Sequence, residues 1–377
     1  MTAKERLLRA LHGEKPDRLP CTVHQWQPYH LEHYLGGISA LEAFRRLGMD
    51  AAIQYFESMG QFWLPGRHRS DSSHPEWIDQ VEVLDQGPET VVQRHTIHTP
   101  GGVLTYQTEG DARTTWVTEY LVKQPEDINL IERYMPVPRL DLAAVGRAYD
   151  EVGDEGILRG FVWGDQAGCW QHACCLLGTQ EMIMAALDDA GWTHRFLRIL
   201  CEKKLRFIAE SLAGARFDLV ETGGGAASST VISPTMHREF CLPYDRELHD
   251  ALHQAGHLVS YHTCGGMMPL AETIAENGAD ATETLAPAGL GGDVEVGELK
   301  RRVGDRMCLI GGMDQINVLT KGTPQQIRAE VHRLFAAGGS GGGYVLSGAD
   351  HFFDAPVGNL EAYARAAREC TYPEKGA

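Results

Sequence analysis

The strongest constraint on the fold is a regular alternation of short apolar segments with helical ones. Eight segments have the length and composition of buried strands: LPCTVH (19–24), DAAIQYF (50–56), ILRGFVWG (157–164), FDLVETGG (217–224), HLVSYHTC (257–264), DATETLAP (280–287), MCLIGGMD (307–314) and GGYVLSGA (342–349). Helical patterns lie between most of them. Eight such strands separated by helices are typical of a (β/α)8 TIM barrel.

Capping residues mark where several of the helices begin and end. The segment 2–13 is predicted to form a short amphipathic helix, and Gly48 ends a helix over 41–48. Ser233-Pro234 begins a helix that Gly256 ends, because serine is a preferred N-cap and proline suits the first turn. A further helix is predicted from about residue 323 to 337.

Residues 66–123 interrupt this α/β pattern. The stretch VEVLDQGPETVVQRHTIHTPGGVLTYQTEG alternates in polarity and contains turn signals at Gly87-Pro88 and at Pro100-Gly102. We therefore predict one α/β domain over residues 1–377, a single barrel with an antiparallel β insertion over 66–123. An open doubly wound sheet is the main alternative. It is disfavoured because no GxGxxG motif follows the first strand and no GxxxxGK[ST] motif occurs.

Charge and composition exclude several classes of function. The chain has 51 acidic and 34 basic residues, a net charge of −17, and no cluster of lysine or arginine. This argues against nucleic-acid or membrane-surface partners. No apolar run approaches the roughly 18 residues of a membrane span, and the charged N-terminus has no apolar signal core. The nine scattered cysteines fit reduced thiols better than a disulfide framework, so we expect a cytoplasmic protein.

Polar residues gather where the predicted strands end, which is where a barrel carries its chemistry. These strand-end residues are His24, Gln25 and Trp26; Trp163 and Asp165; Glu221; His262 and Cys264; Glu283; Asp314; and Asp350 with His351. Folding alone does not require apolar strands to end in this way.

The pair His262-x-Cys264 is the sharpest of these signals. Residues two apart in a strand point to the same side, so both side chains can face the barrel mouth. Imidazole and thiolate together suit zinc. A third ligand could come from another strand end, where Glu221, Asp350 and His351 are available. The alternative is a hydrogen-bonded core histidine beside an inert buried thiol.

Three other motifs favour structural interpretations. The cysteines and histidine of CWQHACC (169–175) precede Leu176-Leu177 and are expected to be core residues of a helix. His95 and His98 lie three apart on a presumed strand, so they face opposite ways and are expected at the surface. The glycine run GGSGGG (338–343) leads into a strand rather than a helix, which indicates a tight loop and not a phosphate cradle.

Several blocks of the chain resemble the uroporphyrinogen decarboxylase superfamily. They are FDLVETGGGAASSTVISPTMHREFCLPYDRELHDALHQAGHLVSYHTCGG, GADATETLAP, LKRRVGDRMCLIGGMDQINVL and GYVLSGADHFFDAPVGNL. The blocks follow one another in the family's order and the resemblance extends over nearly the whole chain. It implies a single (β/α)8 barrel.

The resemblance implies one of two activities. The metal-free porphyrinogen decarboxylases hold substrate carboxylates with arginines in an RQAGR-like segment, and here that place reads HQWQPYHLEHY, which contains no arginine. The second branch comprises zinc methyltransferases that work with corrinoid proteins and carry His-x-Cys on strand five, matched by His262 and Cys264. Their further cysteine ligand falls near Ala349, so Asp350, His351 or Glu221 would have to replace it.

The leading hypothesis is therefore a zinc-dependent methyltransferase. It would move a methyl group from a small methylated donor, a methoxylated aromatic or a methylamine, to or from a corrinoid protein or a thiol. The expected cofactors are zinc and a cobamide on a partner protein. The expected partners are the donor, the corrinoid carrier and a second copy of the chain. The alternatives are a metal-independent lyase with Asp314, His351 or Tyr261 as proton donor, and a non-catalytic barrel that binds a corrinoid or small molecule.

Residues are assigned to this hypothesis by role. The predicted metal ligands are His262, Cys264, Glu221 and Asp350. The predicted catalytic residues are Glu221, Asp314 and His351. The predicted substrate contacts are His24, Gln25, Trp26, Trp163, Asp165 and Glu283.

Overall fold

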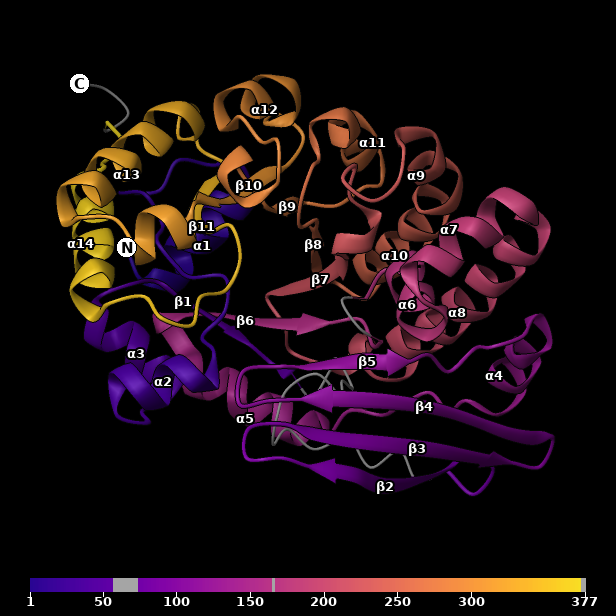
Figure 1. The fold of residues 1–377 in the computed structure, drawn as a ribbon. Helices are drawn as coiled ribbons and strands as arrows, with labels where there is room; N and C mark the ends of the chain where they lie inside the picture. The colour runs from indigo at the N-terminus through magenta and orange to yellow at the C-terminus, as the bar shows by residue number, and fades with distance from the viewer. Residues whose placement is uncertain (57–73, 165–166, 374–377) are drawn as a thin grey trace.

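The computed structural model describes residues 1–56, 74–164 and 167–373. Its centre is a parallel sheet in which each strand pairs with the next one along the chain (Figure 1). The seven strands, in spatial order, are β1 (Ala51–Gln54), β6 (Gly156–Phe161), β7 (Leu219–Gly223), β8 (Leu258–His262), β9 (Ala281–Thr284), β10 (Cys308–Met313) and β11 (Tyr344–Gly348). The predicted parallel α/β barrel is confirmed.

The eighth predicted strand, 19–24, is an extended segment rather than a regular strand. Leu346 N donates to Pro20 O at 3.0 Å, and Thr22 N donates to Leu346 O at 2.9 Å. On the other side, Asp50 N donates to Cys21 O at 2.8 Å, just before β1. The segment therefore joins the two edges of the sheet. Pro20 has no N–H to donate, which shortens the ladder at this point.

Helices follow each strand along the outside of the barrel (Figure 1). Before and beside β1 lie α1 (Ala3–Leu11), α2 (Pro28–Leu35) and α3 (Ala40–Leu47), and α4 (Ile128–Tyr134) and α5 (Leu142–Val152) precede β6. Between β6 and β8 lie α6 (Cys169–Leu177), α7 (Thr179–Asp188), α8 (Ala190–Glu210), α9 (Pro234–Phe240) and α10 (Leu242–Gln254). The remaining helices are α11 (Ala271–Glu276), α12 (Val296–Val303), α13 (Pro324–Gly338) and α14 (Val357–Glu369).

The predicted N-cap at Ser233 is observed, and two further helices begin in the same way. Ser39, Ser233 and Thr323 each accept a hydrogen bond from the backbone N–H three residues further on. The helix predicted from Ser233 to Gly256 is divided at Cys241 into α9 and α10. Cysteines 169 and 174 are buried in α6, as predicted for core residues. The glycine run 338–343 connects α13 to β11, as expected.

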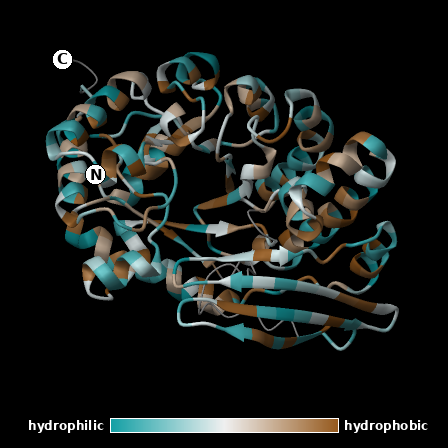
Figure 2. Ribbon diagram, in the orientation of Figure 1, coloured by the Kyte–Doolittle hydropathy of each residue, from teal (hydrophilic) through white to brown (hydrophobic). Residues whose placement is uncertain are grey.

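The insertion is a four-stranded antiparallel sheet formed by β2 (Ile78–Gln86), β3 (Val91–Thr99), β4 (Gly102–Gly110) and β5 (Thr115–Glu119). Figure 2 shows hydrophilic and hydrophobic bands alternating along its strands. Ile97 and Leu104 pair in register on the buried face. Part of the predicted segment, 66–73, lies outside the described residues.

One prediction within the insertion is wrong. His95 was expected at the surface, but its side chain shares the buried face with Ile97, stacks on Tyr106 at 4.2 Å and contacts Asp79 at 3.1 Å. His98 points to the other face, where it contacts Gln80 at 3.1 Å. The alternation was predicted correctly, but packing of one face against the rest of the protein decided which histidine is buried.

The inside of the barrel is layered. Its lower layer is an apolar cluster in which Leu7, Ala10 and Leu11 of α1 pack against residues of seven strands: Ala52, Ile157, Leu219, Ala281, Cys308, Ile310 and Val345, with Leu258 partly buried beside them. Helix α1 therefore plugs the end of the barrel where the strands begin. The opposite end, where the strands finish, is left for polar residues.

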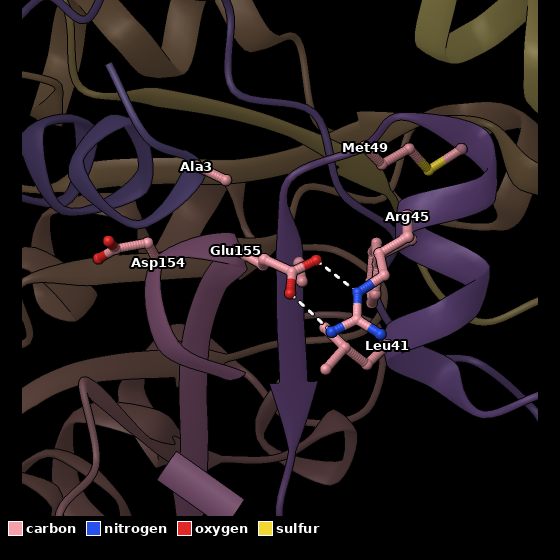
Figure 3. Close-up of a pocket in the computed structure, with 8 residues that line it drawn as sticks. Ala3, Leu41, Arg45, Met49, Asp154 and Glu155 are labelled. Carbon is pink, nitrogen blue, oxygen red and sulfur yellow. Dashed lines mark hydrogen bonds and ion pairs between the residues drawn. The ribbon is translucent and has the colours of Figure 1, made fainter. Parts of the chain in front are cut away.

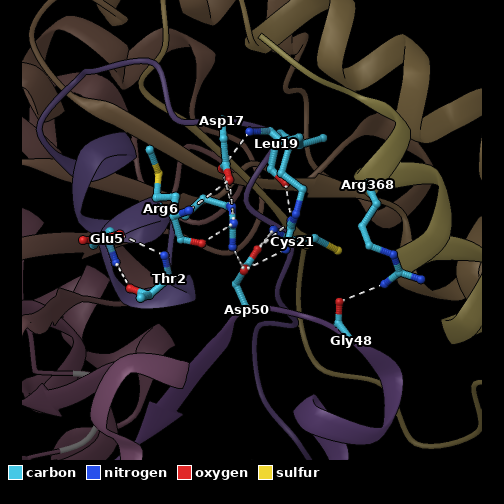
Figure 4. A network of polar contacts seen from close by, with 11 residues as sticks. Thr2, Glu5, Arg6, Asp17, Leu19, Cys21, Gly48, Asp50 and Arg368 are labelled. Carbon is cyan, nitrogen blue, oxygen red and sulfur yellow. Dashed lines mark hydrogen bonds and ion pairs between the residues drawn. The ribbon is translucent and has the colours of Figure 1, made fainter.

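A buried ionic network fastens this plug to the rest of the barrel (Figure 4). Arg6 of α1 donates to Asp50 at 2.6 Å and to Asp17 at 2.7 Å. Asp50 also accepts from Arg18 at 2.9 Å and from the backbone N–H of Cys21 at 2.9 Å. Both Arg6 and Asp50 are buried, so the charges compensate one another away from water.

A small pocket of about 250 Å³ lies near this end of the barrel (Figure 3). It is lined by Ala3, Leu41, Phe44, Arg45, Met49, Ala51, Asp154 and Glu155. Its main charged groups, Arg45 and Glu155, are hydrogen-bonded to each other at 2.6 Å and are close to half-exposed. The pocket therefore presents no converging polar groups for a ligand.

None of the helices in the described ranges is both long and apolar enough to cross a membrane.

Candidate metal centre

Charged residues occupy the layer directly above the apolar plug. Arg159, Glu221 and Glu283 each stand two positions beyond an apolar residue of the lower layer, namely Ile157, Leu219 and Ala281. Because side chains two apart share a face of a strand, all three point into the barrel. Ser260 of β8 occupies the corresponding position after Leu258.

Arg159 of β6 lies between the two glutamates. Its Nη2 donates to Glu221 Oε2 at 2.8 Å and also to Glu283 Oε1. The arginine is 2% exposed, and the glutamates are 3% and 1% exposed. Ser260 Oγ donates to Glu283 Oε1 at 3.1 Å. One oxygen of Glu283 is thus held by two donors, whereas Oε2 has no hydrogen-bond partner among the described residues.

His262, two positions above Ser260, presents its two ring nitrogens to different groups. Nε2 lies 2.6 Å from Cys264 Sγ. Nδ1 lies 3.4 Å from Glu221 Oε1, although the geometry is not that of a hydrogen bond. The ring centroid is 5.2 Å from that of His24, whose Nδ1 is 3.7 Å from Glu283 Oε2. The predicted proximity of His262 and Cys264 is therefore observed.

Asp350 and His351 lie just after β11 and complete the cluster. Asp350 Oδ1 contacts His351 Nδ1 at 2.8 Å and accepts from the His351 backbone N–H at 2.7 Å. Asp350 is also within electrostatic reach of His24, His262 and Cys264.

The surroundings shift the pKa values of these groups in opposite directions. Burial and the charge of Glu283 raise the pKa of Glu221 well above its usual value. Burial also opposes ionisation of Glu283, but the Arg159 charge outweighs it and the pKa of Glu283 is lowered. Burial, with the charge of His24, lowers the pKa of His262 to about 4, and burial raises the pKa of Cys264. A neutral imidazole is the form that binds metals.

The donors in this cluster could hold a metal ion. Glu221, His262 and Glu283 each offer a ligand atom, and these atoms all lie within 4.8 Å of one another. The unpartnered Glu283 Oε2 is a buried acceptor that a cation would satisfy. Imidazole, thiol and carboxylate are the donor types found at zinc sites. The residues present therefore fit a bound metal.

Sequence reasoning missed Arg159. Its signal was a lone arginine within the apolar segment ILRGFVWG, since a charged residue in a buried strand requires a partner. Glu283, predicted as a substrate contact, lies in the charged cluster between Arg159, Glu221 and His262.

Other predicted residues serve the fold. Asp314 was expected to be catalytic, but Oδ1 accepts from Ile316 N at 3.1 Å and Asn317 N at 2.7 Å, and Oδ2 accepts from the Asn317 amide. It caps the π-helical turn Gln315–Thr320 that follows β10. Tyr261, a proton donor in the lyase alternative, is fully buried and contacts His237 at 3.1 Å. It alternates with the inward-facing Ser260 and His262, so it points out of the barrel.

The predicted aromatic contacts are also mostly structural. Trp26 is buried and packs against Phe44 and Phe352 at 5.7 and 5.6 Å. Trp163 is half-buried and packs against His172 at 5.3 Å. Gln25 is half-buried beside His24, and Asp165 lies outside the described residues.

The insertion reaches the loop that carries Asp350. The turn between β4 and β5 places the Arg113 guanidinium 4.8 Å from the centre of the Tyr29 ring. Arg113 also lies 5.6 Å from the Phe353 ring and 3.6 Å from Asp354. The antiparallel sheet therefore contacts the rim of the barrel next to the charged cluster.

Fold and site together define an α/β barrel with a buried cluster of imidazole, thiol and carboxylate groups near the carboxyl ends of its strands. Residues 104–370 match the family model for uroporphyrinogen decarboxylase (URO-D). That span is well over half of the chain, and the chain belongs to this family.

Individual relatives are more distant. The chain is 30% identical to a uroporphyrinogen decarboxylase from Pseudomonas putida strain GB-1 over 239 residues, which is 60% of this chain and 63% of that protein. It is 35% identical to one from Chromohalobacter salexigens over 166 residues, covering 42% and 43% of the two chains. The match thus spans less than two thirds of the length of these relatives.

Among solved structures, a methyltransferase from Methanosarcina mazei has a TM-score of 0.67, with 18% identity over 98% of this chain and 99% of that one. A B12-independent methionine synthase from Shewanella sp. W3-18-1, in complex with selenomethionine, has a TM-score of 0.51, with 10% identity over 94% and 95% of the chains. At these identities the likeness establishes the fold.

Proposed function

We propose that the chain is a zinc-dependent methyltransferase that moves a methyl group between a small methylated donor and a corrinoid protein or a thiol. The observation that carries the proposal is the pairing of His262 Nε2 with Cys264 Sγ at 2.6 Å, beside a buried carboxylate oxygen that accepts no hydrogen bond from the described residues. A methoxylated aromatic or a methylamine is the proposed donor. The cobamide would be held by a separate carrier protein.

The proposed zinc ligands are His262, Cys264 and Glu283, with Asp350 at the fourth position. Glu283 is preferred to Glu221 because Arg159 and Ser260 hold its Oε1, so Oε2 is left to a metal. Glu221 instead places Oε1 near His262 Nδ1. A carboxylate behind a metal-bound histidine fixes the orientation of the ring and raises its basicity. Asp350 takes the place of the cysteine that the resemblance predicts near Ala349.

Bound zinc would polarise the donor's ether oxygen or amine, or lower the pKa of a bound thiol so that it attacks as a thiolate. The chain's own groups have separate tasks. Asp350 orients His351 through Nδ1, so that Nε2 is the atom positioned to exchange a proton with a leaving group. Burial opposes protonation of His351, but the hydrogen bond and charge of Asp350 leave its pKa raised above the usual value.

The decisive experiment measures metal in protein purified without a metal-affinity tag. We expect about one zinc per chain in the wild type and little in His262→Ala or Cys264→Ser, with the circular dichroism spectrum unchanged. Cys175→Ser is the matched control, because Cys175 is also partly exposed but lies on α6. Cobalt substitution adds a direct readout, since a thiolate-to-cobalt charge-transfer band should persist in Cys175→Ser and disappear in Cys264→Ser.

Metal content alone does not establish the reaction, so the loaded enzyme is then assayed for methyl transfer from candidate donors to cob(I)alamin or to a thiol. Failure of the wild type to bind zinc, even after incubation with it, would contradict the proposal. The leading hypothesis would then be a metal-independent lyase that uses the Asp350–His351 pair for proton transfer. It predicts turnover that survives treatment with a chelator.

A further inference from the structure

We propose that Arg159 is a positioning residue of the metal site: it holds two neighbouring carboxylates so that one binds the metal and the other supports the histidine ligand. The inference rests on the proposed zinc site and concerns how that site is assembled. It arises from the contact of Arg159 Nη2 with both Glu221 Oε2 and Glu283 Oε1 inside the barrel.

Arg159 compensates the charge of two neighbouring carboxyl groups. Glu221 and Glu283 lie side by side in a space with almost no exposure to solvent, and like charges this close disfavour joint ionisation. The Arg159 guanidinium supplies one positive charge to the pair. Arginine remains charged even when buried, unlike lysine, so this compensation does not depend on the surrounding polarity.

Arg159 also fixes the orientation of both carboxyl groups. A carboxylate that binds a metal through one oxygen is best oriented when another group holds its second oxygen in place. Arg159 and Ser260 hold Glu283 Oε1, which leaves Oε2 on the side of His24 and His262. The same Nη2 holds Glu221 Oε2, which leaves Oε1 toward His262 Nδ1. One nitrogen thus sets the orientation of two carboxylates through its two N–H groups.

The positive charge of Arg159 also repels a metal ion. A guanidinium near a divalent cation repels it, so an arginine could compete with the metal for the same carboxylates. In this site Arg159 binds Glu221 Oε2 and Glu283 Oε1, whereas Glu283 Oε2, the proposed ligand oxygen, accepts no hydrogen bond from the described residues and lies 3.7 Å from His24 Nδ1. Loss of the arginine would leave two adjacent carboxylates free to rotate and to share a proton. We therefore expect support of the site to outweigh repulsion.

The test is zinc affinity, measured by competition with a chromogenic chelator, in Arg159→Met and Arg159→Lys. Removing a group that orients metal ligands typically costs about 10–100-fold in affinity, and we expect a loss of that size in Arg159→Met. Arg159→Lys, which keeps an N–H donor beside the carboxylates, should lose less. Arg6→Met is the matched control, because Arg6 is a buried arginine on two aspartates at the other end of the barrel. Its zinc affinity should stay within about twofold of the wild type.

A second readout separates positioning from general destabilisation. In a Glu221→Gln background only one charged carboxylate remains beside Arg159, so the further loss on Arg159→Met should be several-fold smaller than in the wild type. If the single Arg159→Met variant fails to fold, Arg159→Lys replaces it in both backgrounds, and its loss should again be smaller in Glu221→Gln than in the wild type.

The outcomes distinguish the two proposals. Zinc affinity that is unchanged or tighter in folded Arg159 variants, with a zinc-binding wild type, would overturn the role of Arg159 and leave the proposed function standing. An Arg6→Met variant that loses zinc as strongly as Arg159→Met would also overturn it. A wild type that binds no zinc would overturn both.

Discussion

Cys264 and His262 place a sulfur and a ring nitrogen 2.6 Å apart at the carboxyl end of β8. Of the nine cysteines, Cys264 and Cys175 are partly exposed and the other seven are buried. We therefore expect small reagents to reach the Cys264 thiol when zinc is absent.

Zinc should shield Cys264 from alkylation. In zinc-free protein we expect slow labelling of Cys264 by a maleimide, because burial keeps the pKa of its thiol high. Zinc should suppress that labelling further, while Cys175 reacts at the same rate with and without the metal. Mass spectrometry of tryptic peptides reports each cysteine separately. Equal labelling of Cys264 under both conditions would argue against sulfur ligation.

The two glutamates should contribute unequally to zinc binding. Glu283→Gln removes a proposed ligand oxygen and should lower zinc affinity by more than about 100-fold, whereas Glu221→Gln should cost roughly 10–100-fold, as for a group that only orients a ligand. Both substitutions preserve shape and replace one ionisable carboxyl group with an amide, so each controls for the other. The reverse order would assign Glu221 as the ligand.

The ionic network beneath the barrel should be a major source of stability. Asp50→Asn leaves Arg6 and Arg18 without their shared buried partner, and breaking such a buried pair typically costs about 3–5 kcal/mol. Glu155→Gln breaks the exposed pair with Arg45 and should cost at most about 1 kcal/mol. Urea unfolding followed by circular dichroism gives both values. Similar costs for the two variants would contradict a special role for burial.

Asp245 should make stability depend on pH. Burial raises its pKa to about 7, against the opposing effects of Tyr261 and Lys204. A carboxyl whose pKa is raised on folding stabilises the protein at low pH and loses that contribution as the pH rises through about 4 to about 7. Ionising it in the folded state costs up to about 4 kcal/mol.

The corresponding measurement compares Asp245→Asn with the wild type in urea unfolding between pH 4 and pH 8. Between pH 4 and pH 8 the free energy of unfolding of the variant should rise, relative to that of the wild type, by up to about 4 kcal/mol, because asparagine does not ionise. Asp188→Asn, at the exposed end of α7, is the control. A difference that stays constant with pH would show that Asp245 is not held in its neutral form.

Local pattern predicted the main elements of the fold well. Short apolar segments located seven strands, and capping residues located the end of α3 at Gly48 and the start of α9 at Ser233. The local sequence pattern gave a wrong prediction where backbone chemistry or tertiary packing also acted on the segment. Pro20 lacks an N–H, so the segment 19–24 bridges the sheet without becoming a strand. Burial of one face of the insertion reversed the expected exposure of His95.

The candidate site was predicted in part. His262 and Cys264 were expected together because side chains two apart on a strand share a side, and the structure places them in contact. Asp314 was predicted from its position at a strand end, and the structure shows that its carboxylate caps the helical turn that follows. Arg159 was missed because a single arginine in an apolar strand has no local partner that would reveal its role.

The sequence by itself determined the order of elements, the two-residue alternation and the presence of an imidazole–thiol pair at one strand end. These are local properties, set by the geometry of a strand. Only the tertiary structure decided which charges meet, because Arg159 lies 62 residues from Glu221 and 124 residues from Glu283 along the chain. Closure of the barrel sets the relative heights of β6, β7 and β9, and that register brings the arginine between the two carboxylates.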